Sequence, residues 1–145
     1  MSSVLLATKQ IQYPTPIIDN EYATLWYHPD AKVIHHEFHQ VLKGTVFKDV
    51  LSAGVKAFKQ HGAGKWLSDD RRNGALHPED SAWAIDVWTP QVLAAGWKYW
   101  ALVMPDKALG KLSMKRYVNM YADLGVAVEI VETPEEGMSW LKSQK

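Results

Sequence analysis

Residues 97–104, WKYWALVM, form a nearly continuous apolar run between Gly96 and Pro105, and this run constrains the fold more than any other segment. A run without alternating polar positions is typical of a strand that is buried on both faces of a sheet. Such a strand needs other elements packed over each face. We therefore predict an α/β fold in which helices cover a central sheet.

Two strand-like segments come before the first helical pattern. Residues 21–27 are rich in aromatic and β-branched side chains, and residues 32–39 alternate around Ile34 and Phe38, with the turn-like sequence HPDA between them. This arrangement predicts a β-hairpin. Further upstream, Pro14 and Pro16 exclude a central strand, so we expect residues 1–20 to form an N-terminal arm and residues 21–145 to form one domain.

Helical and strand-like patterns alternate through short connections after the hairpin. Apolar residues recur at three- and four-residue spacing over 45–60, and Gly62 follows as a stop. The other predicted elements are a strand over 65–69, a broken or double helix over 78–95, a strand over 97–104, a helix capped by Ser113 and ended by Gly125, a strand over 126–131, and a helix that opens at the capping box of Thr133. The order is a hairpin followed by α-β-α-β-α-β-α, which predicts a mixed sheet, antiparallel at the hairpin and parallel afterwards.

Charge and cysteine content exclude several classes of protein. The 145 residues include 16 basic and 16 acidic side chains, so the chain lacks the positive charge that neutralises nucleic-acid phosphates. It contains no Cys, which excludes thiol catalysis, disulfides and cysteine metal sites. The N-terminus has no basic segment before its short apolar stretch, and no apolar run approaches the ~20 residues of a membrane span. We therefore expect a cytoplasmic protein with no signal peptide and no membrane span.

The element order, with KWLSDDRRNGALHPED at 65–80, WTP at 88–90 and GWKYWALV at 96–103, resembles the SpoIIAA-like branch of the STAS-type domains over roughly residues 20–143. This branch includes bacterial anti-sigma-factor antagonists. The resemblance implies a SpoIIAA-like fold and a non-enzymatic regulatory or protein-interaction module. The antagonists carry an Asp-Ser-Ser/Thr-Gly motif whose serine a partner kinase phosphorylates, but residues 70–74 read DRRNG here, so this switch is not expected.

Polar residues follow the predicted strand over 65–69 at its carboxyl end, where open α/β sheets bind ligands. Arg71 and Arg72 can chelate a carboxylate or phosphate, and the helix start at Pro78 can add backbone donors. In the alternative interpretation, Asp69 or Asp70 pairs with one of these arginines and only pins the turn.

The chain contains seven tryptophans, an unusual number for its size. An indole N–H needs a partner, so Trp is frequent at clefts and interfaces as well as in cores. Most of the seven are expected in the core, whereas two in the second helical region can line a partner contact or roof an apolar pocket. The predicted ligand- or partner-binding residues are Asp70, Arg71, Arg72, Asn73, His77, Trp83 and Trp88.

The sequence HHEFH at 35–39 suggests a metal site but does not support one. On a strand, the period of two places His35, Glu37 and His39 on one face and His36 and Phe38 on the other. His35 and His39 then lie roughly 13 Å apart, too far to share an ion. We predict a polar strand face, with no metal and no cofactor.

Three functions are compatible with these patterns, and no nucleophile elbow, Walker loop or Gly-x-Gly-x-x-Gly motif indicates catalysis. The leading hypothesis is an interaction module that offers the surface around residues 69–73 and the second helix to a protein partner or to a second copy. The runner-up is a carrier of a small apolar or lipid-like anionic ligand, in a pocket under the second helix with Arg71 or Arg72 at its mouth. The third is a small hydrolase that uses His77 or Asp70.

Overall fold

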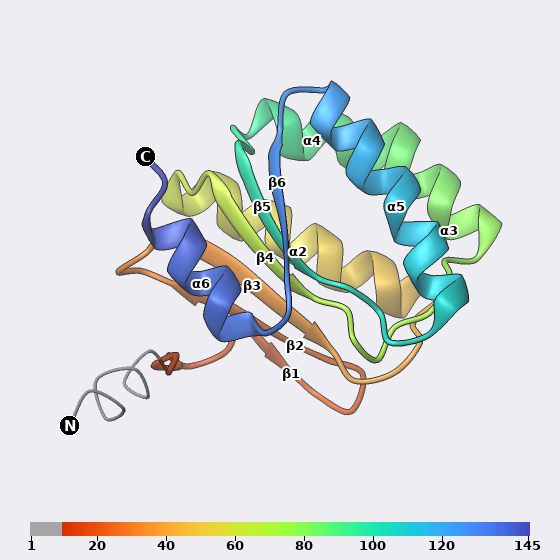
Figure 1. The fold of residues 1–145 in the computed structure, drawn as a ribbon, viewed down its shortest axis with the longest axis horizontal. Helices are drawn as coiled ribbons and strands as arrows, with labels where there is room; N and C mark the ends of the chain where they lie inside the picture. The colour runs from red at the N-terminus through yellow and green to blue at the C-terminus, as the bar shows by residue number, and fades with distance from the viewer. Residues whose placement is uncertain (1–9) are drawn as a thin grey trace.

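One six-stranded sheet organises the protein, as the computed structural model of residues 10–145 shows (Figure 1). The strands follow chain order, β1-β2-β3-β4-β5-β6. The first three pair antiparallel and the last four pair parallel. The predicted α/β class and mixed sheet are thus confirmed. Residues 1–9 of the predicted arm, and with them the signal-peptide prediction, lie outside the described residues.

The boundaries of the elements follow the sequence patterns except at two places, the predicted arm, where residues 18 and 19 form a short strand paired with residues 24 and 25, and the start of the helix before Gly125. The strands are β1 (Ile18–Asp19), β2 (Ala23–His28), β3 (Val33–Phe38), β4 (Lys65–Asp69), β5 (Tyr99–Val103) and β6 (Ala127–Val131). The helices are α2 (Thr45–His61), α3 (Pro78–Trp83), the π-helical turn η1 (Ala84–Trp88), α4 (Thr89–Ala94), α5 (Ala108–Asp123) and α6 (Pro134–Lys142). Within residues 10–145, no helix is long and apolar enough to cross a membrane.

Helices cover both faces of the sheet, but unequally (Figure 1). The main core lies on the face shared by α2, α5 and the α3–η1–α4 segment, and it includes Trp66 and Leu102. On the opposite face, α6 packs against β4, β5 and β6 through a smaller cluster that includes Leu67, Ala101 and Leu141. Since β5 contributes Leu102 to one cluster and Ala101 to the other, the strand predicted from the apolar run is buried on both faces.

The helix predicted over 78–95 is broken by a π-helical turn. Pro90 has no N–H to continue the α-helical pattern, and its ring collides with the carbonyl four residues earlier in a regular α-helix. The Thr89 N–H therefore donates to the Ala84 carbonyl, five residues back, and the Thr89 hydroxyl donates to the same oxygen at 2.7 Å. The turn absorbs one extra residue and ends at Trp88, which is buried in the main core.

The predicted start of the helix before Gly125 was wrong. Ser113 does not cap this helix, because α5 already begins at Ala108 after Lys107, which is extended and makes no side-chain cap. A β-carbon at Gly110 would overlap Pro105 at the end of β5. The first turn of α5 therefore lies close to Pro105 and has no capping side chain.

A cluster of aromatic and histidine rings covers part of the sheet face that carries α6. Tyr13, from the predicted arm, lies with its ring centroid 4.6 Å from that of Trp26 and 5.9 Å from that of His35. His28 Nε2 and His35 Nδ1 are 3.1 Å apart, and His35 Nε2 has no hydrogen-bond partner within the described residues. Burial lowers the pKa of His28 to about 4 and the pKa of His35 well below its ordinary value, so both rings are neutral in the folded protein.

We expect the free energy of unfolding to fall as the pH drops from about 6.5 towards 4. The unfolded chain binds protons at these two histidines below a pKa of about 6.5, whereas the folded protein does not, so each histidine contributes stability above that pH and loses it below. The loss approaches about 1.4 kcal/mol per pH unit for each group. Urea denaturation at pH 7.5 and pH 5 measures it. A His28→Asn variant with an unchanged pH dependence would contradict the assignment to His28.

Candidate functional site

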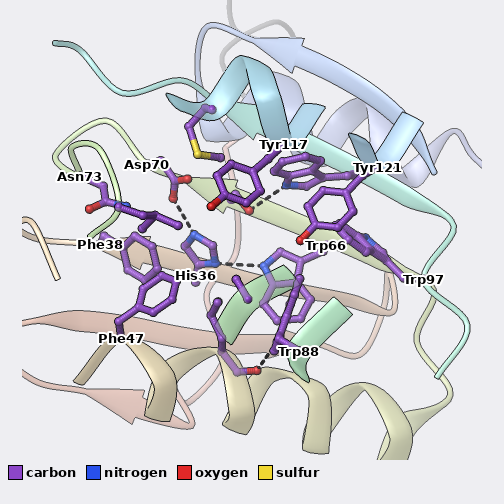
Figure 2. Close-up of a pocket in the computed structure, with 16 residues that line it drawn as sticks. His36, Phe38, Phe47, Trp66, Asp70, Asn73, Trp88, Trp97, Tyr117 and Tyr121 are labelled. Atoms are coloured by element: carbon purple, nitrogen blue, oxygen red, sulfur yellow. Dashed lines mark hydrogen bonds and ion pairs between the residues drawn. The ribbon is translucent and has the colours of Figure 1, made fainter. Parts of the chain in front are cut away.

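A cavity of about 60 Å³ lies inside the main core, between the sheet and the helical layer (Figure 2). Strands β3, β4 and β5 line it on one side, and α2, η1 and α5 line it on the other. Its lining residues are buried apart from Leu76, which is partly exposed. Aromatic rings form most of the wall, among them Trp66, Trp88, Trp97, Trp100, Tyr117 and Tyr121.

A buried hydrogen-bonded chain runs along the sheet side of the cavity (Figure 2). Trp66 Nε1 donates to His36 Nδ1 at 3.0 Å, and His36 Nε2 lies 2.7 Å from Asp70 Oδ1. Because Nδ1 accepts the indole hydrogen, the one hydrogen of the His36 ring is on Nε2 and is donated to Asp70. His36 is therefore a neutral ring with a fixed tautomer, and the charge of this chain is that of the Asp70 carboxylate.

Two lining residues retain unused hydrogen-bond acceptors. Asn73 is 4% exposed, and its Oδ1 is buried with no hydrogen-bond partner within residues 10–145. Over the same residues, the bond from His36 is the one hydrogen bond made by the Asp70 side chain. Buried polar atoms in native proteins are nearly always paired. The end of the cavity at Asp70 and Asn73 is therefore where the hydrogen-bond donor of a ligand would find acceptors.

The helical wall of the cavity is fixed by polar contacts that the protein satisfies itself. Tyr121 donates to the Thr89 hydroxyl at 2.9 Å, since Thr89 gives its own hydrogen to the Ala84 carbonyl. Burial raises the pKa of Tyr121 to about 12, so its hydroxyl keeps this hydrogen. Trp88 Nε1 donates to the Leu51 carbonyl at 2.9 Å. A ligand in the cavity thus meets the carbon faces of these rings and not unpaired N–H or O–H groups.

The structure brings together only part of the site predicted from the sequence. Asp70, Asn73 and Trp88 line the cavity. Arg72 and His77 are exposed and do not line it, and His77 caps α3 by accepting the Glu79 backbone N–H at Nδ1. Within the described residues, no hydrogen bond joins His77 to Asp70, and the hypothesis of a hydrolase that uses either residue stays a prediction.

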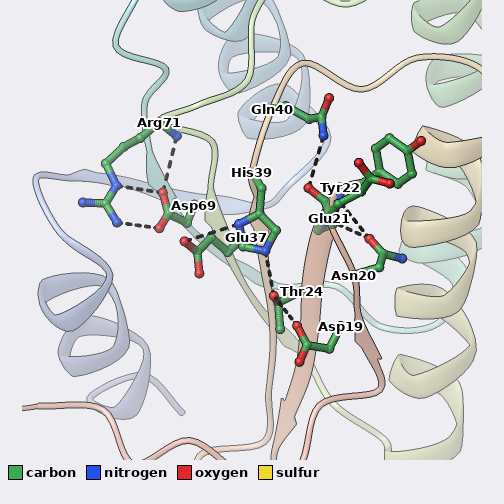
Figure 3. Close-up of polar contacts among 11 residues, drawn as sticks. Asp19, Asn20, Glu21, Tyr22, Thr24, Glu37, His39, Gln40, Asp69 and Arg71 are labelled. Atoms are coloured by element: carbon green, nitrogen blue, oxygen red, sulfur yellow. Dashed lines mark hydrogen bonds and ion pairs between the residues drawn. The ribbon is translucent and has the colours of Figure 1, made fainter.

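Arg71 and Trp83 do not line the cavity either. Arg71 binds the buried Asp69 carboxylate through two hydrogen bonds, Nε to Oδ1 at 2.9 Å and Nη2 to Oδ2 at 2.7 Å (Figure 3). Side chains alternate between the two faces of the sheet along β4. Because Ser68 lines the cavity, its neighbour Asp69 lies on the opposite face. Trp83 packs edge-on against Phe47, and the Lys48 amine lies 5.9 Å from its ring. The structure thus contains the aspartate–arginine pair of the alternative interpretation, and the role of this pair in holding the turn stays a prediction.

We expect Arg71→Ala to lower the free energy of unfolding by about 1–3 kcal/mol, because it leaves the Asp69 carboxylate buried without its partner. The matched variant Arg72→Ala removes an exposed side chain and should change stability by no more than about 0.5 kcal/mol. Urea denaturation of both variants measures the difference. Equal stability of the two variants would show that the Arg71–Asp69 pair does not hold the turn.

The side chains of the histidine-rich strand β3 alternate between the two faces of the sheet, as the period of two predicts. His36 and Phe38 line the cavity, whereas His35 contacts His28 on the other face. His39 bonds the Thr24 hydroxyl at 2.8 Å. Over residues 10–145, no group of three or more His, Asp or Glu side chains is placed to hold a metal ion.

Sequence patterns missed most of the cavity wall, above all His36 and the tryptophans of β4 and β5. The alternation along β3 placed His36 opposite to His35, but its neighbours depend on the register in which His36 lies beside Ser68 of β4.

The chain matches no protein-family model, no curated protein and no solved structure. The resemblance to SpoIIAA-like domains therefore stays a prediction.

Proposed function

We propose that this protein binds a small, mainly apolar molecule in the aromatic cavity and carries out no chemistry on it. The observation that carries the proposal is a cavity with an aromatic wall that ends at the unpaired Oδ1 of Asn73 and at the Asp70 carboxylate, which makes one hydrogen bond within residues 10–145. Protein interiors are close-packed, and both internal voids and unpaired buried polar atoms are few. An apolar pocket with a small number of convergent polar groups is the usual form of a small-molecule site.

The polar groups of the cavity are not arranged for catalysis. Both nitrogens of His36 are occupied, Nδ1 by the Trp66 indole and Nε2 by Asp70, so the ring cannot exchange a proton with a ligand. The Ser68 hydroxyl accepts from Trp100 Nε1 at 2.9 Å, and no histidine or carboxylate bonds it within the described residues. A serine without a base is not an activated nucleophile. This arrangement supports binding and not hydrolysis.

The volume of the cavity limits what can enter. A cavity of roughly 150 Å³ holds one benzene molecule, and this cavity has less than half of that volume. The part of the ligand that is enclosed is therefore a group of about two or three heavy atoms, such as one end of a short alkyl chain with its polar atom. The interaction-module hypothesis requires instead a partner on the outer surface, around Arg72, His77 and Trp83, and it stays a prediction.

The methionines supply a direct test of this proposal. Met114 lines the cavity, whereas Met138 is buried in the cluster under α6 and serves as an internal control. In protein labelled with ¹³C at the methionine methyls, we expect a three-carbon compound from the set n-propylammonium, 1-propanol and propionate to shift the Met114 signal saturably and to leave that of Met138 unchanged. No shift of Met114 at high concentrations of all three compounds would refute the proposal.

We expect Ala84→Val to abolish the Met114 shift, because Ala84 lines the cavity and two added methyl groups occupy the space of the ligand. The matched control is Ala82→Val, which makes the same change at an exposed position of the same helical segment. Circular dichroism checks that both variants keep the fold. Binding that persists in Ala84→Val, or that is lost equally in Ala82→Val, would place the compound outside the cavity.

A further inference from the structure

We propose that the group bound at the inner end of the cavity is a protonated amine, so that the ligands are short alkylammonium compounds and not anions. This inference rests on the proposed function and adds the charge of the ligand. It follows from three features of the site: the charge of the wall, the hydrogen-bond acceptors that Asp70 and Asn73 leave unused, and the aromatic rings around the cavity.

The wall carries one carboxylate and no compensating cation. Asp70 lines the cavity, and neither Lys nor Arg is among the lining residues of the described chain. The nearest arginine in sequence, Arg71, is held by Asp69 on the other face of the sheet. An anionic ligand would thus be buried beside a like charge without a counter-ion, which is strongly unfavourable. A cation would pair with Asp70 in a site of low dielectric.

His36 cannot supply the missing positive charge while the chain of hydrogen bonds is intact. A second hydrogen on the ring would have to sit on Nδ1, which accepts the Trp66 N–H. A hydrogen on His36 Nδ1 would point at the N–H of Trp66, so two donors would face each other and their hydrogen bond would be lost. The indole of Trp66 thus holds the hydrogen of His36 on Nε2, where it is donated to Asp70, and the second oxygen of Asp70 makes no hydrogen bond within residues 10–145.

The Asp70 carboxylate keeps acceptor capacity at this end of the cavity. Asn73 Oδ1 is buried with no partner, and Asp70 receives one hydrogen bond, from His36, within residues 10–145. A primary ammonium group brings three N–H donors and no acceptor, whereas a carboxylate brings acceptors alone. The donor count of an ammonium group therefore matches the acceptors that the site leaves unused.

The aromatic wall adds a second attraction for a cation. Trp66, Trp88 and Tyr121 lie around the cavity together with other rings, and their N–H and O–H groups are bonded to protein acceptors. An ammonium group over the face of an aromatic ring is attracted by the ring quadrupole, most strongly where water is excluded. The same rings pack against the short alkyl chain of the ligand.

The test compares three ligands of similar size, n-propylammonium, 1-propanol and propionate, by the Met114 methyl shift at pH 7.5. We expect n-propylammonium to bind at least about tenfold more tightly than 1-propanol, as a charge-assisted hydrogen bond is stronger than a neutral one, and propionate not to bind. Equal or tighter binding of 1-propanol or propionate overturns the inference but leaves the proposed function standing. No Met114 shift with any of the three overturns both.

Two matched variants locate the preference. Asp70→Asn keeps an oxygen to accept from His36 and replaces the charged oxygen by an amide, so we expect affinity for n-propylammonium to fall at least about tenfold and affinity for 1-propanol to stay within about threefold. Asp69→Asn makes the same change one residue earlier, on the opposite face, and should leave the ranking of the ligands intact. An unchanged ranking in Asp70→Asn overturns the inference. Should Asp70→Asn fail to fold, the ranking on the wild-type protein still decides the question.

Discussion

His36→Leu is expected to lower the free energy of unfolding by about 3 kcal/mol, one of the two largest effects that the structure predicts. The substitution removes the donor to Asp70 Oδ1, at 2.7 Å in the native protein, and leaves a buried carboxylate without its one hydrogen bond within residues 10–145. It also removes the acceptor of the Trp66 indole. Urea denaturation at pH 7.5 measures the loss.

The double variant His36→Leu with Asp70→Leu is the control for this effect. Replacing both members of a buried polar pair by apolar side chains is often nearly neutral, so the double variant should recover most of the stability lost in the single variant. Both variants lack the acceptor of the Trp66 N–H, and their difference therefore isolates the unpaired carboxylate. A double variant that is less stable than His36→Leu would contradict this account of the pair.

Gly54→Ala is the second substitution with a large expected effect. We expect it to lower the stability of the protein, although helix propensity favours alanine over glycine. Alanine in the middle of a helix is favoured over glycine by about 1 kcal/mol. A β-carbon at Gly54 of α2, however, would overlap the ring of Trp66, which is 1% exposed and bonded to His36. An overlap with a buried ring that is fixed by a hydrogen bond lies at the upper end of the about 1–3 kcal/mol that overpacking costs, so we expect a net loss of about 2 kcal/mol after the gain in propensity, and a shifted Met114 signal in the unliganded protein.

Ser52→Ala supplies the comparison for Gly54→Ala, because Ser52 is exposed on the same helix. There the change in propensity acts without a packing change, and stability should stay within about 0.5 kcal/mol. Thermal denaturation of both variants is sufficient. A more stable Gly54→Ala protein would show that α2 does not lie against Trp66 as closely as the structure places it.

Local signals carried most of the prediction of the fold. The spacing of apolar residues and the glycine stop predicted α2 to within one residue at its end, and Gly62 has the positive φ of 62° expected of such a stop. The Thr133 cap of α6 was predicted equally well, since its hydroxyl accepts the Glu136 N–H. The start of α5 was missed because its N-cap residue, Lys107, makes no side-chain cap, whereas Ser113 looked like a cap but lies inside the helix.

The candidate site could be predicted only in part, for a related reason. Position at the end of β4 was sufficient to indicate Asp70 and Asn73, and helical position indicated Trp88. The pairing of Arg71 with Asp69 depends on which face of the sheet each side chain lies on at the end of the strand. Both lie on the face opposite to the cavity. The register between β3 and β4 places His36 beside Trp66 and Ser68. This register depends on packing between segments that are 30 or more residues apart in the sequence.

A crystal structure of the protein with saturating n-propylammonium tests the central claim most directly. We predict electron density for the compound inside the cavity, with its carbon chain against Trp66 and Trp88 and its nitrogen within hydrogen-bond distance of Asp70. A cavity that stays empty while the compound is bound elsewhere or not at all would contradict the claim that this protein is a small-ligand binding domain.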